Sequence, residues 1–345
     1  MRPTAPSLLV SFALLALSIL AGCEGSKLPD SGDGPAAGGE KPKPVIAMLP
    51  KLVNIDYFDA CKRGAQKAAD ELGVTLIFDG PTEASAEGQN QFIETWIRQN
   101  VDAICIAPNQ PRAARPFVER ARAKGIKVLT WDTDAPESGR DLMVNQVDDR
   151  LLGELLMDEL ARQMGEEGKW AIAIGSLDAA NLNTWRRHAE ARARKYPKLV
   201  LAATEVTREN EEVARQRVET LLNAHPDLKG ILAFDSNSVP GAAAAIERAG
   251  KAGKVALVGN STPRKMRRYI DDGVLESFFL WDPRALGGLT VRLAAALIEG
   301  REVKEGMEVA GHGKLVFSRE DPRVVILSTP IRFTKENIAQ YDFGI

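Results

Sequence analysis

Short apolar runs alternate with longer amphipathic stretches along the chain from residue 45 onward. Each apolar run is typical of a buried strand, and in the stretch that follows it the apolar residues recur at helical spacing. The stretches ending in ELG and AKG also supply the glycine expected just past a helix end. This alternation predicts parallel sheets with helices on both faces. The first strands are expected in PVIAML, VTLIFD, DAICIAP and IKVLTWD, and the first helices at 58–72, 85–99 and 112–124.

The alternation breaks at the turn-rich stretch ESGRD and then starts again. Further strands are expected in LMVNQ, KWAIAIGS, LVLAATEV, GILAFD, KVALVGN, VLESFFLWD, KLVF and RVVILS, and further helices at 148–164, from 181, at 209–223, 239–249, 264–271 and 284–299. So many strand–helix units exceed one sheet, and two α/β lobes account for them better. We expect the chain to cross between lobes at 132–136. The predicted N-terminal lobe is 45–133 plus 262–305, and the C-terminal lobe is 134–261 plus 306–345.

The amino terminus has a different pattern from the rest of the chain. The run LLVSFALLALSILA is apolar and uncharged, and it is shorter than the roughly 20 residues that a spanning helix needs. We interpret 1–22 as a secretory signal peptide. It leads into LAGC, which is similar to a bacterial lipobox, so Cys23 is the expected lipidation site; a plain signal peptide with a chance cysteine is the alternative. The rest of 23–44 is rich in Gly, Pro and charge, which predicts a flexible tether.

Composition excludes several classes of function. The chain of 345 residues has a formal net charge of −2 and no basic block, so nucleic acid is not an expected partner. Cys105 alternates with apolar residues in a predicted strand and Cys61 lies on a predicted early helix, and two buried free thiols are favoured over a disulfide between them. No nucleotide-binding, zinc-protease or hydrolase motif occurs, and none of the three histidines has a triad context. We therefore expect no metal, no cofactor and no catalysis.

The strand ends carry the candidate chemistry. In open parallel sheets, ligands bind beyond the carboxyl ends of the strands. Carboxylates and amides there pair with vicinal hydroxyls, and aromatic rings pack against the C–H faces of a sugar ring. The candidate ligand-binding residues are Lys51, Asp56, Tyr57, Phe58, Trp131, Asp132, Asp134, Asn181, Trp185, Asp235, Ser236, Asn260 and Trp281.

Simpler explanations exist for several of these residues taken singly. Asp235 or Asn181 alone could cap a helix. Trp185 and Trp281 could pack the lobes together, and Asp134 could shape a turn. Their coincidence at so many strand ends favours one grouped site for a small sugar or polyol.

Several segments also resemble a known family, and the likeness runs from about residue 45 to residue 343. They are AMLPKLVNIDYFDACKRGAQKAADELG, FDGPTEASAEGQ, GIKVLTWDTDAPESGR, ALVGNSTPRKMRRYIDDG, FFLWDP and FTKENIAQYDF. The chain resembles the periplasmic sugar-binding proteins of ABC importers of the ribose-binding type, in particular the autoinducer-2 binding proteins and their rhamnose-binding relatives. The resemblance implies the type I periplasmic binding protein fold, with two Rossmann-like lobes and a three-stranded hinge. It also implies that the lobes close on a ligand, which is then delivered to a membrane permease.

The family's ligand residues carry over in part. The resemblance assigns ligand contacts to Lys51, after the first strand, and to Asp132, the first aspartate of TWDTD. The autoinducer-2 binders then have Asp-Gln and Pro-Asp-Ala where this chain has Asn181-Leu182 and Phe234-Asp235-Ser236. The loss of a carboxylate at Asn181 and the bulk of Phe234 favour a different sugar or polyol.

The expected protein is a monomeric, lipid-anchored solute-binding protein of the periplasm or cell envelope, with an ABC transporter permease as partner. A sensing lipoprotein that feeds a chemoreceptor or histidine kinase is the alternative. A neighbouring permease gene would favour transport, and a neighbouring kinase gene would favour sensing. A repressor core is disfavoured because a signal peptide stands where a DNA-binding head would be. An enzyme is the least favoured class, and only turnover of a bound sugar would support it.

We predict that Cys23→Ala releases the protein from the membrane, because the tether then has no lipid to hold it there. Cell fractionation and mass spectrometry of the mature amino terminus measure both effects. Recovery of the wild type in the soluble periplasmic fraction, with residue 23 unmodified, would contradict the prediction.

Overall fold

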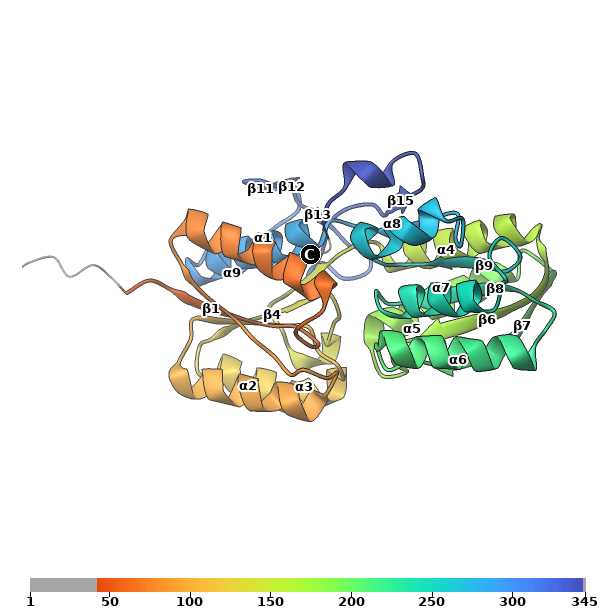
Figure 1. The fold of residues 1–345 in the computed structure, drawn as a ribbon. Coiled ribbons are helices and arrows are strands. Elements are labelled where there is room, and N and C mark those ends of the chain that lie inside the picture. The colour runs from red at the N-terminus through yellow and green to blue at the C-terminus, as the bar shows by residue number, and fades with distance from the viewer. Residues whose placement is uncertain (1–41, 344–345) are drawn as a thin grey trace, which may run out of the picture. The chain divides into compact units, whose positions relative to one another are not determined.

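The computed structural model describes residues 42–343 (Figure 1). The predicted signal peptide, Cys23 and nearly all of the tether lie outside the described residues. Among residues 42–343, no helix combines the length and the apolar character that a membrane span needs.

The larger lobe is built on a seven-stranded sheet with the order β13-β14-β5-β4-β3-β1-β2. Its pairings are parallel except for that of β13 with β14. The strands are β1 (Val45–Leu49), β2 (Thr75–Phe78), β3 (Ala103–Ile106), β4 (Lys127–Trp131), β5 (Leu142–Asn145), β13 (Val316–Phe317) and β14 (Val324–Ile326). The helices of this lobe are α1 (Asp56–Leu72), α2 (Ala86–Gln99), α3 (Pro111–Ala123) and α9 (Pro283–Ile298), with the short η1 (Pro136–Ser138) after β4.

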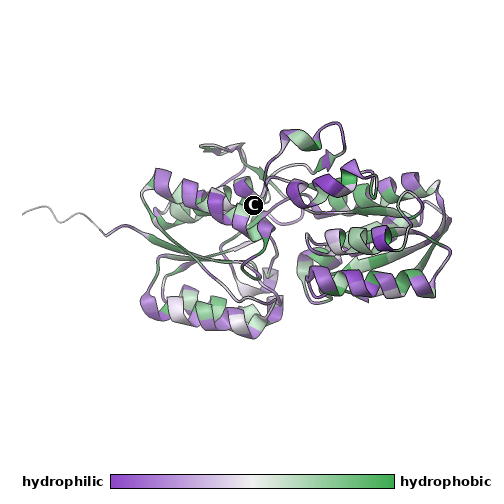
Figure 2. Ribbon diagram, in the orientation of Figure 1, coloured by the Kyte–Doolittle hydropathy of each residue, from purple (hydrophilic) through white to green (hydrophobic). Residues whose placement is uncertain are grey.

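Alternation along the strands sorts the larger lobe into layers. In β1, Ile46 and Met48 pack with α1 and α9, whereas Ala47 and Leu49 pack with α2 and α3 on the opposite face. Successive side chains of a strand point to opposite faces, so a fully apolar strand requires helices on both sides. Figure 2 shows the result, with hydrophobic strands between helices whose outer faces are hydrophilic.

The smaller lobe contains a four-stranded parallel sheet with the order β7-β6-β8-β9. Its strands are β6 (Glu167–Ile174), β7 (Lys198–Val206), β8 (Leu228–Phe234) and β9 (Ala256–Gly259). Its helices are α4 (Asp149–Met164), α5 (Ala180–Ala193), α6 (Glu211–Ala224), α7 (Ser238–Arg248) and α8 (Pro263–Asp271). Strand β10 (Phe278–Leu280) pairs antiparallel with β15 (Ile331–Phe333) and meets the end of β9 through a bridge between Asn260 and Phe279. The remaining elements are the hairpin β11 (Glu308–Val309) and β12 (Gly313–Lys314) and the short η2 (Ile338–Gln340).

These elements lie close to the positions that the sequence predicts. Each predicted helix is present with ends shifted by a few residues at most, and the predicted α/β fold with parallel sheets is confirmed. The predicted strand VLESFFLWD is shorter than expected, since only its centre forms β10. Cys61 and Cys105 are both buried and free, as expected.

The division into lobes differs from the predicted boundaries. Strand β5 pairs with β4 and therefore belongs to the larger sheet, so the first crossing lies after residue 145 and not at 132–136. Strands β13 and β14 also join this sheet, whereas α8 and β10 lie with the smaller lobe. Within residues 42–343, the chain thus passes between the lobes three times, after β5, after β10 and after β14.

An ion pair explains why ESGRD turns the chain back into the same sheet. Asp134 receives hydrogen bonds of 2.6 Å from both Nε and Nη2 of Arg140. The Arg140 side chain has no exposed surface, and it also bonds Asp321, which precedes β14. This bidentate contact closes the turn and places β5 parallel to β4.

Helices α1 and α9 approach each other at glycines and lie side by side (Figure 1). A Cβ atom on Gly287 would lie 2.0 Å from the carbonyl oxygen of Cys61. A Cβ atom on Gly64 would lie 1.9 Å from the carbonyl oxygen of Arg284. Backbone cannot yield as a flexible side chain can, so this contact requires glycine on both helices.

We predict that Gly287→Ala lowers the free energy of unfolding by about 1–3 kcal/mol, because overpacking outweighs the helix propensity gained with alanine. Urea denaturation measures the change. Gly288→Ala is the matched control on the next residue of α9, where the nearest atom would lie at 3.3 Å. Equal stabilities of the two variants would contradict the proposed close contact.

Candidate ligand-binding site

A cavity with about 340 Å³ of empty space lies where the carboxyl ends of strands from both lobes meet. The larger lobe and its connections contribute Lys51, Ile55, Tyr57, Phe58, Asp132 and Trp281, and the smaller lobe contributes Asn181, Leu182, Trp185, Glu209, Asp235, Ser236 and Asn260.

Most of the candidate residues come together on this cavity. Those that line it are Lys51, Tyr57, Phe58, Asp132, Asn181, Trp185, Asp235, Ser236, Asn260 and Trp281. Asp56, Trp131 and Asp134 do not line it.

The three exceptions have other roles in the structure. Trp131 ends β4 fully buried, and its indole N–H donates to the carbonyl of Cys105 over 3.2 Å. Asp134 is engaged by Arg140, as described above. Asp56 begins α1, where a carboxylate is favourable at the positive end of the helix dipole. None of these three residues lines the cavity, and their ligand contact stays a prediction.

Glu209 is the most informative residue that the sequence analysis missed; Ile55 and Leu182 are the others. It follows β7, so the rule that selected the other strand ends applies to it as well. The sequence pattern instead predicts a helix that begins at Glu209. In the structure Asn210 caps α6, and Glu209 stands before the cap and faces the cavity.

Three carboxylate residues of the cavity have left-handed backbone conformations. The φ angles are 63° at Asp132, 51° at Glu209 and 108° at Asp235. Such conformations cost on the order of 1–3 kcal/mol each and cluster at functional sites. Side-chain amides hold two of them: Asn181 donates to the carbonyl of Asp132, and Asn237 donates to that of Glu209.

Lys51 joins the two sides of the cavity. Its Nζ atom lies 3.2 Å from Oδ1 of Asn181 and 3.3 Å from Oε1 of Glu209, both in the smaller lobe. Burial by itself would lower the pKa of Lys51, but the neighbouring Glu209, Asp132 and Asp235 raise the pKa above its usual value. The side chain is therefore a buried cation held by partners from the opposite lobe.

Buried amides fix the loop that presents Lys51. Gln89 of α2 donates to the carbonyls of Pro50 and Ala107, each over 2.8 Å. The side-chain amide of Asn109 donates to the carbonyl of Lys51 over 2.9 Å, and the backbone N–H of Asn109 donates to Oε1 of Gln89 over 2.8 Å. The ends of β1 and β3 are thus tied together directly beneath the cavity.

Burial raises the pKa values of the two strand-end aspartates. For Asp132 burial raises the pKa to about 6, although Lys51 and a 2.7 Å hydrogen bond from Tyr57 oppose the shift. For Asp235 burial and the charge of Glu209 raise the pKa to about 7. Asp235 also accepts the backbone N–H groups of Asn237 and Ser238, so it caps α7 as well as lining the cavity.

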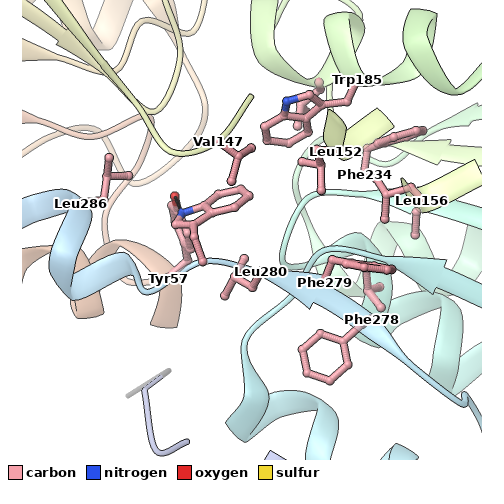
Figure 3. Packing of buried hydrophobic residues seen from close by; sticks show 14 of the residues in the cluster. Tyr57, Val147, Leu152, Leu156, Trp185, Phe234, Phe278, Phe279, Leu280 and Leu286 are labelled. Carbon is pink, nitrogen blue, oxygen red and sulfur yellow. Dashed lines mark hydrogen bonds between the residues drawn. The ribbon is translucent and has the colours of Figure 1, made fainter. Parts of the chain in front are cut away.

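Aromatic rings form the apolar wall of the cavity. The ring centroids of Tyr57 and Trp281 are 6.1 Å apart, and those of Trp281 and Trp185 are 5.8 Å apart. Tyr57 and Trp185 belong to the hydrophobic cluster in Figure 3. The indole N–H of Trp185 donates to Asp149 over 2.6 Å, and that of Trp281 donates to Tyr57 over 3.0 Å. The polar edges of both indoles thus have partners within the protein, and both buried rings line the cavity.

The arrangement suits binding of a small polar molecule. Carboxylates and amides from opposite lobes face aromatic surface across a space of limited size. Among residues 42–343, no group of histidine, cysteine and acidic side chains has the geometry to hold a metal ion.

Comparisons with known proteins agree with this geometry. Residues 46–302 match the model of the periplasmic binding protein domain family. The ribose import binding protein of Bacillus subtilis is 27% identical over 296 residues, which are 84% of this chain and 93% of that protein. The structure of LsrB from Clostridium saccharobutylicum in complex with AI-2 is 26% identical, with a TM-score of 0.81 over 87% of this chain and 100% of the other. A solute-binding protein of an ABC transporter from Clostridium phytofermentas, with bound L-rhamnose, is 27% identical, with a TM-score of 0.82 over 87% and 98%.

We predict that Asp132→Asn is stabilising relative to the wild type at neutral pH but not at pH 4. The pKa of Asp132 in the folded protein, about 6, exceeds the usual 3.8, so the folded protein holds this proton more tightly. The contribution of Asp132 to the free energy of unfolding therefore falls as the pH rises from about 4 to about 6, by up to about 3 kcal/mol. Asparagine has no such dependence. Urea denaturation across this range should show the difference between the two proteins growing with pH, and a constant difference would contradict the assignment.

Proposed function

Because this chain belongs to the periplasmic binding protein domain family, we propose that it captures a small sugar or sugar-like ligand for an ABC transporter permease. One observation carries the proposal: polar groups from both lobes converge with aromatic rings on a single cavity. The named relatives support the ligand class, since their names or bound molecules are ribose, L-rhamnose and AI-2. They are binding proteins, and the chain is assigned to the same class and not to the enzymes.

The side chains that line the cavity would make different kinds of contact with such a ligand. Asp132 and Glu209 accept hydrogen bonds from hydroxyls, and Lys51 and Asn260 donate to ring or hydroxyl oxygens. The faces of Trp185 and Trp281 cover the C–H surface of the sugar. Asn181 takes the place of a carboxylate of the autoinducer-2 binders, so we propose a sugar or polyol other than autoinducer-2.

Closure of the lobes follows from where these groups lie. Lys51 bonds Asn181 and Glu209 across the cavity, and Gln110 of the larger lobe bonds Asp178 of the smaller over 3.1 Å at the rim. A ligand that contacts both lobes stabilises the arrangement in which they meet. We propose that the three connections between the lobes act as the hinge for this motion.

The cellular setting is also part of the proposal. Lipidation of Cys23 would anchor the protein in the cell envelope, and the tether 24–44 would let the lobes reach a permease in the same membrane. The protein acts as a monomer, because one chain supplies both sides of the cavity.

We predict that Asp132→Asn weakens binding of the sugar found by a thermal-shift screen of monosaccharides by about 10- to 100-fold. The variant loses a charge-assisted hydrogen bond of roughly 1.5–3 kcal/mol, and 1.4 kcal/mol corresponds to a factor of ten in affinity. Asparagine tolerates the left-handed backbone of this position, so the fold should be retained. Isothermal titration calorimetry measures the affinity.

Asp134→Asn is the matched control, because the same substitution two residues further on removes the partner of the buried Arg140. It should lower the free energy of unfolding by about 3 kcal/mol while the affinity changes little. Unchanged affinity of Asp132→Asn, or equal losses in both variants, would remove Asp132 from the site.

A further inference from the structure

The cavity is lined by more negative than positive side chains. Its charged residues are one cation, Lys51, and three carboxylates, Asp132, Glu209 and Asp235. All four are more than nine-tenths buried, with exposed fractions between 2% and 7%. Lys265, a lysine nearby on α8, does not line the cavity and bonds Glu211 and Asn237 instead. Lys51 therefore offsets only one of the three negative charges.

Hydrogen bonds within the protein leave two carboxylate oxygens of the cavity without a partner, beside the donor groups of Ser236 and Asn260. Lys51 already donates to Asn181 and Glu209, the hydroxyl of Tyr57 donates to Asp132, and both indole N–H groups have partners. Among the acceptors, Oδ1 of Asp132 accepts from Tyr57, and Oε1 of Glu209 accepts from Lys51. In the part of the chain described by the structure, Oδ2 of Asp132 and Oε2 of Glu209 have no hydrogen-bond partner. These two carboxylate oxygens belong to opposite lobes.

Asp235 contributes less to this excess than the other two carboxylates. Its oxygens accept from the backbone N–H groups of Asn237 and Ser238 and from the Ser238 hydroxyl at the start of α7. The helix dipole and these donors compensate its charge. Asp132 and Glu209 together still exceed the single charge of Lys51.

Closing this cavity around a neutral ligand would bury the excess negative charge in a medium of low dielectric constant, which is costly. An ammonium group on the ligand would remove that cost and would supply the donors that the two free oxygens lack. The aromatic walls add a further attraction, because the faces of tryptophan and tyrosine rings favour cations.

We propose that the ligand is a sugar or polyol that carries a protonated amine, which binds between Asp132 and Glu209 from opposite lobes. This inference rests on the proposed function and names the ligand class of the same site. Glu209 becomes the specificity-determining residue, since its side chain lines the cavity and, unlike Asp235, accepts no backbone N–H of a helix start among the described residues. Anionic sugars are excluded by the same charge balance.

The experiment is isothermal titration calorimetry of the full chain at pH 7.5 with glucosamine, galactosamine and mannosamine. Each is compared with its neutral parent hexose and with the corresponding uronic acid. We expect at least one amine to bind ten or more times more tightly than its parent, and no measurable binding of the uronic acids. If neutral sugars bind as well as or better than their amines, this inference is overturned and the proposed function stands. If no sugar of the panel binds, this inference is overturned, and the thermal-shift screen of monosaccharides decides the proposed function.

Glu209→Gln tests the assigned residue, with Glu211→Gln as the matched control. Glutamine at 209 should weaken amine binding tenfold or more and change the affinity for the neutral parent much less, so that the preference between them collapses. Glu211 bonds Lys265 and does not line the cavity, so its variant should keep the wild-type preference. A Glu209→Gln protein that folds normally, by circular dichroism, and retains the preference for the amine would overturn the role of Glu209.

Discussion

A single buried ammonium group, that of Lys51, sets the arrangement of the two lobes around the cavity. An ammonium withdrawn from water is strongly destabilising unless it is paired and hydrogen-bonded. Its partners Asn181 and Glu209 lie in the opposite lobe, so the requirement can be met only when the lobes are together. The amides of Gln89 and Asn109 hold the loop of Lys51 from below, so the lysine cannot easily move to find other partners. Interlobe contact and ligand-site geometry therefore depend on the same group.

The carboxylates around Lys51 are held at a cost to the stability of the fold. Asp132, Glu209 and Asp235 have left-handed backbone conformations, and burial raises the pKa values of Asp132 and Asp235. Neither feature contributes to packing. A site preorganised for a ligand accounts for both, because ligand groups can satisfy the charges that the protein itself leaves unpaired.

Asp132 and Asp134 are two residues apart in one turn, yet the first lines the cavity and the second makes a structural ion pair. Asp132 directly follows β4, and its carboxylate accepts a hydrogen bond from the hydroxyl of Tyr57 and lines the cavity. Asp134 is turned toward Arg140, and through Arg140 it ties β4 to the segment before β14. One aspartate is thus available to a ligand, and the other holds the turn that keeps β5 in the same sheet as β4.

The sequence alone determined the secondary structure, the α/β class and most of the candidate site, because each depends on local periodicity and on residue types at strand ends. Tertiary structure decided which lobe holds each element. The stretch ESGRD looks like a boundary, but a bidentate ion pair from Arg140 folds it back into the same sheet. Side-chain direction decided that Trp131 packs in the core, although the adjacent Asp132 faces the cavity. Left-handed backbone conformations at residues 208 and 209 decided that Glu209 also faces the cavity. Periodicity does not encode these outcomes, because they depend on dihedral angles and partners that come from segments distant in the chain.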